Sequence, residues 1–187
     1  MSIIDIASHQ PQNDDIYFLD CNVLMYTFYT NGSYATDLVY DYSLLITKII
    51  NTKSKLILTD VLLSEFINTY IQTEFHRLAR LNGWPHTKEY FKKTFKLSTE
   101  YDDILQEIKC IITRQMIPVF TLVDDEFSKI TFENIFDNPE TFDFNDRYYG
   151  YCMAPFNSYI VTNDADFSDV TQCNIITKNQ TLLSRIF

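Results

Sequence analysis

Acidic and amide side chains follow two short apolar runs of the sequence. Asp20 and Asn22 follow the run 16–19, and Asp164 and Asp166 follow a later run. Apolar runs of this length are typical of strands buried in a parallel sheet, and open α/β sheets bind ligands where their strands end. Carboxylates at such an edge can act as acids, bases or metal ligands. For Asp20 a simpler role stays open, that of capping the following helix.

Glu65 lies in a segment with helical periodicity after the second apolar run. Counting at the helical period places Glu65, Thr69, Gln72 and His76 in one stripe beside an apolar face. The stripe is either part of a site or an ordinary solvated face of the helix.

A third acidic motif is Asp143-Phe144-Asn145-Asp146, just before the second Asp-bearing strand. Asp143 has structural roles available, because it can cap the helix that follows or pair with Arg147 four residues later. Asp146 lies near the first turn of that helix, where an acid is favourable in any case.

Composition excludes several kinds of site. The chain has 187 residues, of which 46% are hydrophobic, so we expect one domain over 1–187 with a substantial core. Three glycines allow neither a phosphate-cradling loop nor a dinucleotide fingerprint, and the three histidines lack zinc-protease spacing. An enzyme of this composition would have to use carboxylates.

The four cysteines are widely spaced and form no Cys-x-x-Cys pair, which favours reduced thiols over a disulfide frame or zinc site. The apolar runs are too short to span a bilayer, and residues 1–14 are polar and acidic, unlike a secretory signal. We therefore expect a cytoplasmic protein without a membrane partner, with 1–14 as a loose leader.

The pattern along the chain alternates strands with helices. Strands are expected at 16–19, 55–59, 117–122, 158–162 and, at the sheet edge, 174–177. Helices are expected at 23–28, 35–51, 60–81, 87–95, 99–115 and 144–153, with a helix and loop between 124 and 139. Such alternation predicts an α/β fold with a parallel sheet. If the first and fourth strands are neighbours, Asp20 and Asp164 meet at the topological switch point of the sheet, where the strand order reverses.

Taken together, these motifs resemble the PIN-domain ribonucleases. The matching segments, in chain order, are the apolar strand into Asp20-Cys21-Asn22, Ser64-Glu65, Asp143-Phe144-Asn145-Asp146, and Thr162-Asn163-Asp164-Ala165-Asp166-Phe167. The resemblance implies a three-layer sandwich with a central five-stranded parallel sheet between helices. It also implies an endoribonuclease that depends on Mg²⁺ or Mn²⁺, with RNA as its substrate. Many such proteins, the VapC-like group among them, are toxins of toxin–antitoxin pairs, so an antitoxin partner and a homodimer are open expectations. The alternative within the family is a related PIN protein that acts without an antitoxin.

The resemblance also implies the roles of individual residues. The catalytic and metal-binding set is Asp20, Glu65, Asp146 and Asp164; the supporting set is Asn22, Thr162, Asp143 and Asp166. Four converging carboxylates repel one another unless a cation neutralises them, and hard divalent cations take oxygen ligands.

The sequence departs from the family in two places. Bulky residues, Arg147-Tyr148-Tyr149, follow Asp146 where a small apolar helix is usual, and 74–115 is a helical insertion or arm. Within 76–96 the basic residues, which we expect to bind RNA, are Arg77, Arg80, Lys88, Lys92, Lys93 and Lys96. Lys88, Lys92 and Lys96 are spaced to share a helix face; the alternative is a solvated helix that keeps an acidic protein soluble.

Two other classes of protein remain open. One is a catalytically inactive PIN-like interaction module, against which the four acids weigh. The other is a different α/β phosphohydrolase with an aspartyl nucleophile, which commonly has a second acid at the position of Asn22.

Overall fold

The computed structural model describes residues 2–125, 127–130, 135–136, 144–170 and 172–185. Its centre is one sheet of six strands in the order β1-β6-β5-β2-β3-β4, with every neighbouring pair parallel. The strands are β1 (Ile3–Asp5), β2 (Ile16–Leu19), β3 (Lys55–Leu58), β4 (Phe120–Leu122), β5 (Tyr159–Val161) and β6 (Asn174–Thr177). The predicted α/β class with a parallel sheet is thus confirmed.

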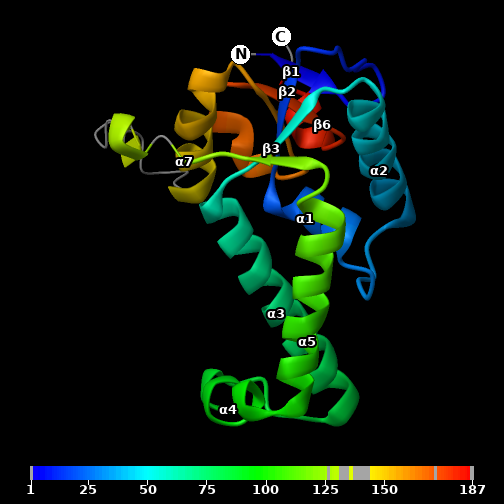
Figure 1. Ribbon diagram of the computed structural model, residues 1–187, viewed down its shortest axis with the longest axis vertical. Coiled ribbons are helices and arrows are strands. Elements are labelled where there is room, and N and C mark those ends of the chain that lie inside the picture. Colours follow the sequence, from blue (N-terminus) through cyan, green and yellow to red (C-terminus); the bar gives the residue numbers. More distant parts are fainter. Residues whose placement is uncertain (1, 126, 131–134, 137–143, 171, 186–187) are drawn as a thin grey trace.

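Helices cover both sides of the sheet (Figure 1). The α-helices with described bounds are α1 (Cys21–Phe28), α2 (Thr36–Asn51), α3 (Asp60–Asn82), α4 (Lys88–Lys93), α5 (Thr99–Ile111), α7 (Phe144–Met153) and α8 (Gln180–Leu183). Short 3-10 segments are η1 (Phe95–Leu97), η3 (Phe127–Lys129), η5 (Ala154–Phe156) and η6 (Ala165–Asp169); η2 (Ile112–Met116) is a π-helical turn. In Figure 1, α2 and α7 lie on opposite sides of the sheet.

The middle of the sheet is apolar on both faces, because successive strand residues point to opposite sides. Tyr17 and Phe18 in β2 are both fully buried. Tyr17 stacks on Tyr159 of β5 at 5.3 Å between ring centroids, whereas Phe18 meets Tyr149 of α7 at 4.9 Å. Alternation within one short strand therefore lets β2 pack against β5 through Tyr17 and against α7 through Phe18.

The sixth strand comes from the segment expected to be a loose leader. That expectation is wrong for residues 3–5, which form β1 and pair with Ile175 and its neighbours in β6. The predicted count of five strands and the predicted edge position of 174–177 are wrong for the same reason. A strand of three half-buried or exposed residues carries too little apolar pattern to be seen in the sequence.

Strand β4, at the edge of the sheet, is shorter than expected. Residues 117–119 are not part of β4, because the α5 helix continues through the π-helical turn η2 and Ile117 N–H still donates to the Ile112 carbonyl. Pro118 has no backbone N–H to give a sheet ladder.

Helices α3 and α5 run away from the sheet together and carry α4 at their far end (Figure 1). The far end has its own aromatic packing around Phe75, Phe91 and Phe95, which meet pairwise at 4.9–5.6 Å. Thr59 caps the start of α3, and Gly83 ends it with φ +66°, a left-handed conformation that suits glycine. We call 74–116 the arm.

None of the described helices is long and apolar enough to cross a membrane.

Candidate functional site

Asp20 stands where β2 ends and α1 begins, and its carboxylate serves both elements. Oδ1 accepts the Cys21 N–H at 2.6 Å, which caps the helix, and Oδ2 accepts the Thr162 hydroxyl at 2.8 Å. Asp20 therefore does cap the helix, but capping uses only one of its two carboxylate oxygens. Two carboxylate oxygens offer about four acceptor positions, of which these bonds occupy two.

The Thr162 hydroxyl joins the ends of β2 and β5. While it donates to Asp20, it accepts the Asp164 N–H at 2.9 Å and the Asn22 side-chain amide at 3.4 Å. Asn22 Oδ1 in turn accepts the Asn163 N–H at 3.3 Å. Two of the four supporting residues expected from the sequence, Asn22 and Thr162, thus hold the two Asp-bearing strand ends together.

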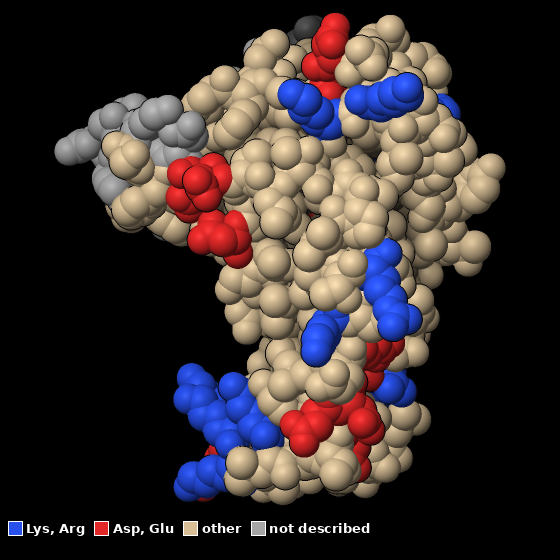
Figure 2. All heavy atoms as spheres, in the orientation of Figure 1, with Lys and Arg blue, Asp and Glu red and all other residues tan. Residues whose placement is uncertain are grey.

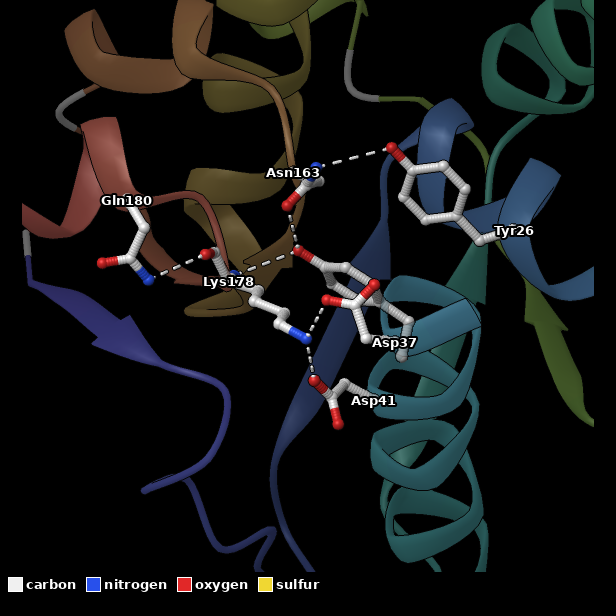
Figure 3. Close-up of polar contacts among 7 residues, drawn as sticks. Tyr26, Asp37, Asp41, Asn163, Lys178 and Gln180 are labelled. Carbon is white, nitrogen blue, oxygen red and sulfur yellow. Dashed lines mark hydrogen bonds and ion pairs between the residues drawn. The ribbon is translucent and has the colours of Figure 1, made fainter. Parts of the chain in front are cut away.

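A further polar layer fixes the end of β5 against α2 (Figure 3). The Tyr42 hydroxyl lies 3.1 Å from Asn163 Oδ1 and accepts the Lys178 N–H at 3.1 Å. The Lys178 ammonium pairs with Asp37 at 2.8 Å and with Asp41. These contacts hold the loop after β5 against α2 and against the residue that follows β6.

Glu65 comes to the same place from α3, and Asp146 from α7. The Tyr149 hydroxyl donates a hydrogen bond to the Glu65 carboxylate. Burial, followed by this hydrogen bond, raises the pKa of Tyr149, so the phenol keeps its proton. The bulky residues that looked out of place in the sequence therefore include a direct partner of Glu65.

Tyr149 was missed as a site residue, although a local signal existed. It lies three positions after Asp146 on a helix, so both face the same way. Its aromatic bulk suggested packing, and only its hydroxyl makes the polar contact.

The acids line one cleft of about 310 Å³. From the predicted site it contains Asp20, Asn22, Glu65, Asp146, Asp164 and Asp166. Its remaining lining residues are Cys21, Met25, Tyr26, Tyr34, Thr69 and Asn145. Thr162 is fully buried behind Asp20, and Asp143 lies outside the described residues.

The electrostatics of the cleft are dominated by Asp20, whose side chain is only 5% exposed. Burial raises the pKa of the Asp20 carboxyl to about 7; hydrogen bonds from Thr162 and the Cys21 N–H oppose the rise, and the charges of Glu65 and Asp164 add to it. A cation placed between these carboxylates would remove the repulsion.

The donor set suits a hard divalent cation in its chemistry, since the cleft offers five carboxylates and further oxygen ligands. No three acidic, histidine or cysteine side chains within the described part of the chain are close enough together to hold a metal ion as they stand. The side chains are instead turned toward protein donors, Asp20 to Thr162 and Glu65 to Tyr149.

The basic residues expected to bind RNA divide into several groups. Arg77 is committed to Glu74, which it meets with two hydrogen bonds of 2.9 and 2.7 Å, and Lys93 pairs with Glu89 at 2.8 Å. Lys88 and Lys92 line a second pocket, in the arm. Arg80 is exposed.

Lys96 does not share a helix face with Lys88 and Lys92, so that prediction is wrong. Helix α4 ends at Lys93, and Lys96 lies in η1 with its ammonium 5.4 Å from the centroid of the Phe91 ring.

Comparison with known proteins finds similarity in structure but not in sequence. No protein-family model and no curated protein sequence matches the chain. Among solved structures, the chain is similar to VapBC2 from Rickettsia felis bound to a DNA fragment from its promoter. The identity is 11%, the TM-score is 0.49, and the match covers 87% of this chain and 98% of that chain.

What the fold and site define is an α/β protein with an all-parallel sheet and an acidic cleft at its switch point.

Proposed function

We propose that this protein is an endoribonuclease that depends on Mg²⁺ or Mn²⁺ and cleaves RNA in the acidic cleft. The observation that carries the proposal is the shared cleft of Asp20, Glu65, Asp146 and Asp164, which come from four separate parts of the sequence. The resemblance of their motifs to PIN-domain ribonucleases supports the same reading.

In this proposal Asp20, Asp146 and Asp164 hold the metal, and Glu65 either joins them or orients the attacking water. A bound Mg²⁺ or Mn²⁺ would supply a more acidic water and charge stabilisation on the scissile phosphate. Thr162 orients Asp20, and Tyr149 holds Glu65. Water adds to phosphorus, the bond to the leaving oxygen breaks, and a proton passes to that oxygen.

The direct test measures cleavage of a labelled RNA with Mn²⁺ and with EDTA. Asp20→Asn and Asp146→Asn are nearly isosteric and should lower the rate about 100-fold or more. Asp103→Asn is a matched control, because Asp103 is an exposed acid on α5 outside the cleft. Wild-type rates in the two folded cleft variants would contradict the proposal, whereas no cleavage by the wild type with Mn²⁺ would favour the inactive interaction module.

Metal binding has a readout that does not depend on activity. A cation that binds only the native state should raise the melting temperature by about 5–10 °C when its concentration is about 100 times its Kd. The shift should disappear in Asp164→Asn, and this variant should be more stable than the wild type without metal, because it removes one repelling charge. An unchanged melting temperature in millimolar Mn²⁺ would count against a metal site here.

An antitoxin partner is also part of the proposal, by the VapC-like resemblance. Expression of the chain alone should arrest bacterial growth, and Asp20→Asn should relieve the arrest. Equal growth arrest by the wild type and by Asp20→Asn would exclude the nuclease as its cause.

A further inference from the structure

A second pocket lies in the arm, away from the acidic cleft. Its volume is about 310 Å³, at the small end of the range for ligand pockets. It is lined by Gln72, Phe75 and His76 of α3, by His86 and Thr87, and by Lys88, Phe91 and Lys92 of α4.

The pocket is apolar inside and cationic at its rim. Phe75 and Phe91 are 2% and 9% exposed, whereas His76, Lys88 and Lys92 are exposed. No acidic side chain is among the residues that line it. A nucleotide has the complementary character, because it joins a flat base to a charged phosphate.

His76 and His86 form a stacked pair at the mouth of the pocket. Their ring planes differ by 7°, and their Nδ1 atoms are 3.2 Å apart. In a neutral pair one Nδ1 donates and the other accepts, so the accepting histidine must carry its proton on Nε2. The pair therefore offers an N–H donor to an anion together with flat imidazole rings.

Charge directs a polyanion to this side of the arm. Residues 76–96 contain six basic residues and one acid, Glu89, a net charge of +5, which leaves −15 for the rest of a chain whose total is −10. Arg77 and Lys93 have intramolecular acidic partners. Figure 2 shows Lys and Arg gathered at the α4 end of the arm, with Asp and Glu beside them.

Helix α3 connects this pocket with the acidic cleft. Glu65 and Thr69 line the cleft, and Gln72 and His76 line the pocket, so the stripe expected from the sequence is divided between the two. The rise of a helix separates Glu65 from His76 by about 16 Å. A strand held at both places would lie along α3.

We propose that the arm pocket binds one nucleotide of a single-stranded RNA whose scissile bond lies a few nucleotides away in the acidic cleft. This inference rests on the proposed nuclease function and adds the form of the substrate. The strand is single because a base enters the pocket only when it is unpaired. Lys88, Lys92 and the histidine pair bind the phosphate, and the base covers Phe75 and Phe91.

The experiment uses the full chain with ¹⁵N-labelled histidine, in EDTA, titrated with a single-stranded RNA of about ten nucleotides. The protein has three histidines, so the spectrum contains its own control. His76 and His86 signals should shift as RNA is added. The signals of His9, which is buried and 2.7 Å from the Tyr17 hydroxyl, should stay in place.

A pair of double variants tests the rim of the pocket by the affinity for the same RNA. Lys88→Gln with Lys92→Gln should weaken binding about tenfold and reduce the salt dependence by up to about two units of slope. Lys109→Gln with Arg114→Gln removes the same charge from exposed positions elsewhere on the arm and should have little effect.

The outcomes separate this inference from the proposed function, because EDTA prevents cleavage and only binding is measured. Stationary His76 and His86 signals, or equal losses of affinity in the two double variants, would contradict nucleotide binding in the arm pocket even if RNA is cleaved. Shifted signals and the unequal losses support it, and an absence of cleavage with Mn²⁺ would then count against the nuclease alone.

Discussion

The hydroxyl of Thr162 donates a 2.8 Å hydrogen bond to Oδ2 of Asp20, which lies 142 positions earlier in the chain. Both side chains are buried, and the bond joins the carboxyl ends of two adjacent parallel strands. It stabilises the charged form of Asp20 against the burial that favours the neutral form. The role of Thr162 is therefore to position Asp20 and to keep it ionisable.

Replacing Thr162 with valine removes this donor while keeping the shape of the side chain. We expect a loss of about 1–2 kcal/mol in the free energy of unfolding. The pKa of Asp20 should rise further, so the acid limb of the pH–rate profile for cleavage should move to higher pH. Thr162→Ser keeps the hydroxyl and should restore the profile; an identical shift in the serine variant would show that the methyl group is what matters.

Tyr149→Phe removes the hydroxyl that donates to Glu65. Loss of a partner that orients an acidic group should lower the cleavage rate about tenfold or more. The control is Tyr148→Phe on the same helix, because the Tyr148 hydroxyl pairs with Asp125, which does not line the cleft. Both variants should lose about 1 kcal/mol of stability, but only the first should lose activity. Equal rates in the two variants would leave Tyr149 with a structural role.

The raised pKa of Asp20 predicts how the stability of the metal-free protein depends on pH. Its ordinary value is 3.8 and its value in the folded state is about 7, so the native state holds the proton more tightly than the unfolded state. This contribution to stability is complete below pH 3.8 and is lost as the pH rises through about 7.

Asp20→Asn should remove that contribution, which amounts to at most about 4 kcal/mol. Urea unfolding in EDTA at several pH values would measure the difference in free energy between wild type and variant. The variant should gain relative to the wild type as the pH rises from about 4 to 7. Parallel curves for the two proteins would mean that Asp20 keeps an ordinary pKa.

Glu74 predicts a stability effect in the arm. It is 2% exposed; burial by itself raises its pKa, but hydrogen bonds from Arg77 and Tyr29 outweigh burial, so the pKa is lowered and Glu74 is charged. Arg77→Met would leave this carboxylate with Tyr29 and Asn31 as partners. Because Arg77 is itself 32% exposed, we expect a cost of about 2–3 kcal/mol, below the usual range for a fully buried pair.

The matched control is Arg80→Met, which removes an exposed charge from the same helix and should cost less than about 0.5 kcal/mol. Thermal or urea unfolding of the two variants measures the contrast. Similar stabilities would show that the Glu74–Arg77 pair contributes little.

Local patterns in the sequence were sufficient for most of the secondary structure. Apolar runs located β2, β3, β5 and β6, and helical periodicity located α2, α3 and α7, because these signals depend only on residues within a few turns or one strand. The alternation of the two kinds of element then led to the parallel sheet, and to the meeting of Asp20 with Asp164 at its switch point.

The tertiary structure decided the contacts that depend on register and packing. β1 exists because Ile3 and Ile4 pair with β6, whose residues lie more than 170 positions later in the chain. Tyr149 reaches Glu65 across 84 positions, and Arg77 turns to Glu74 and not to solvent. Side chains of the same type can be ligands, partners or solvated charges, and which of these they become depends on the neighbours that folding brings within hydrogen-bonding distance.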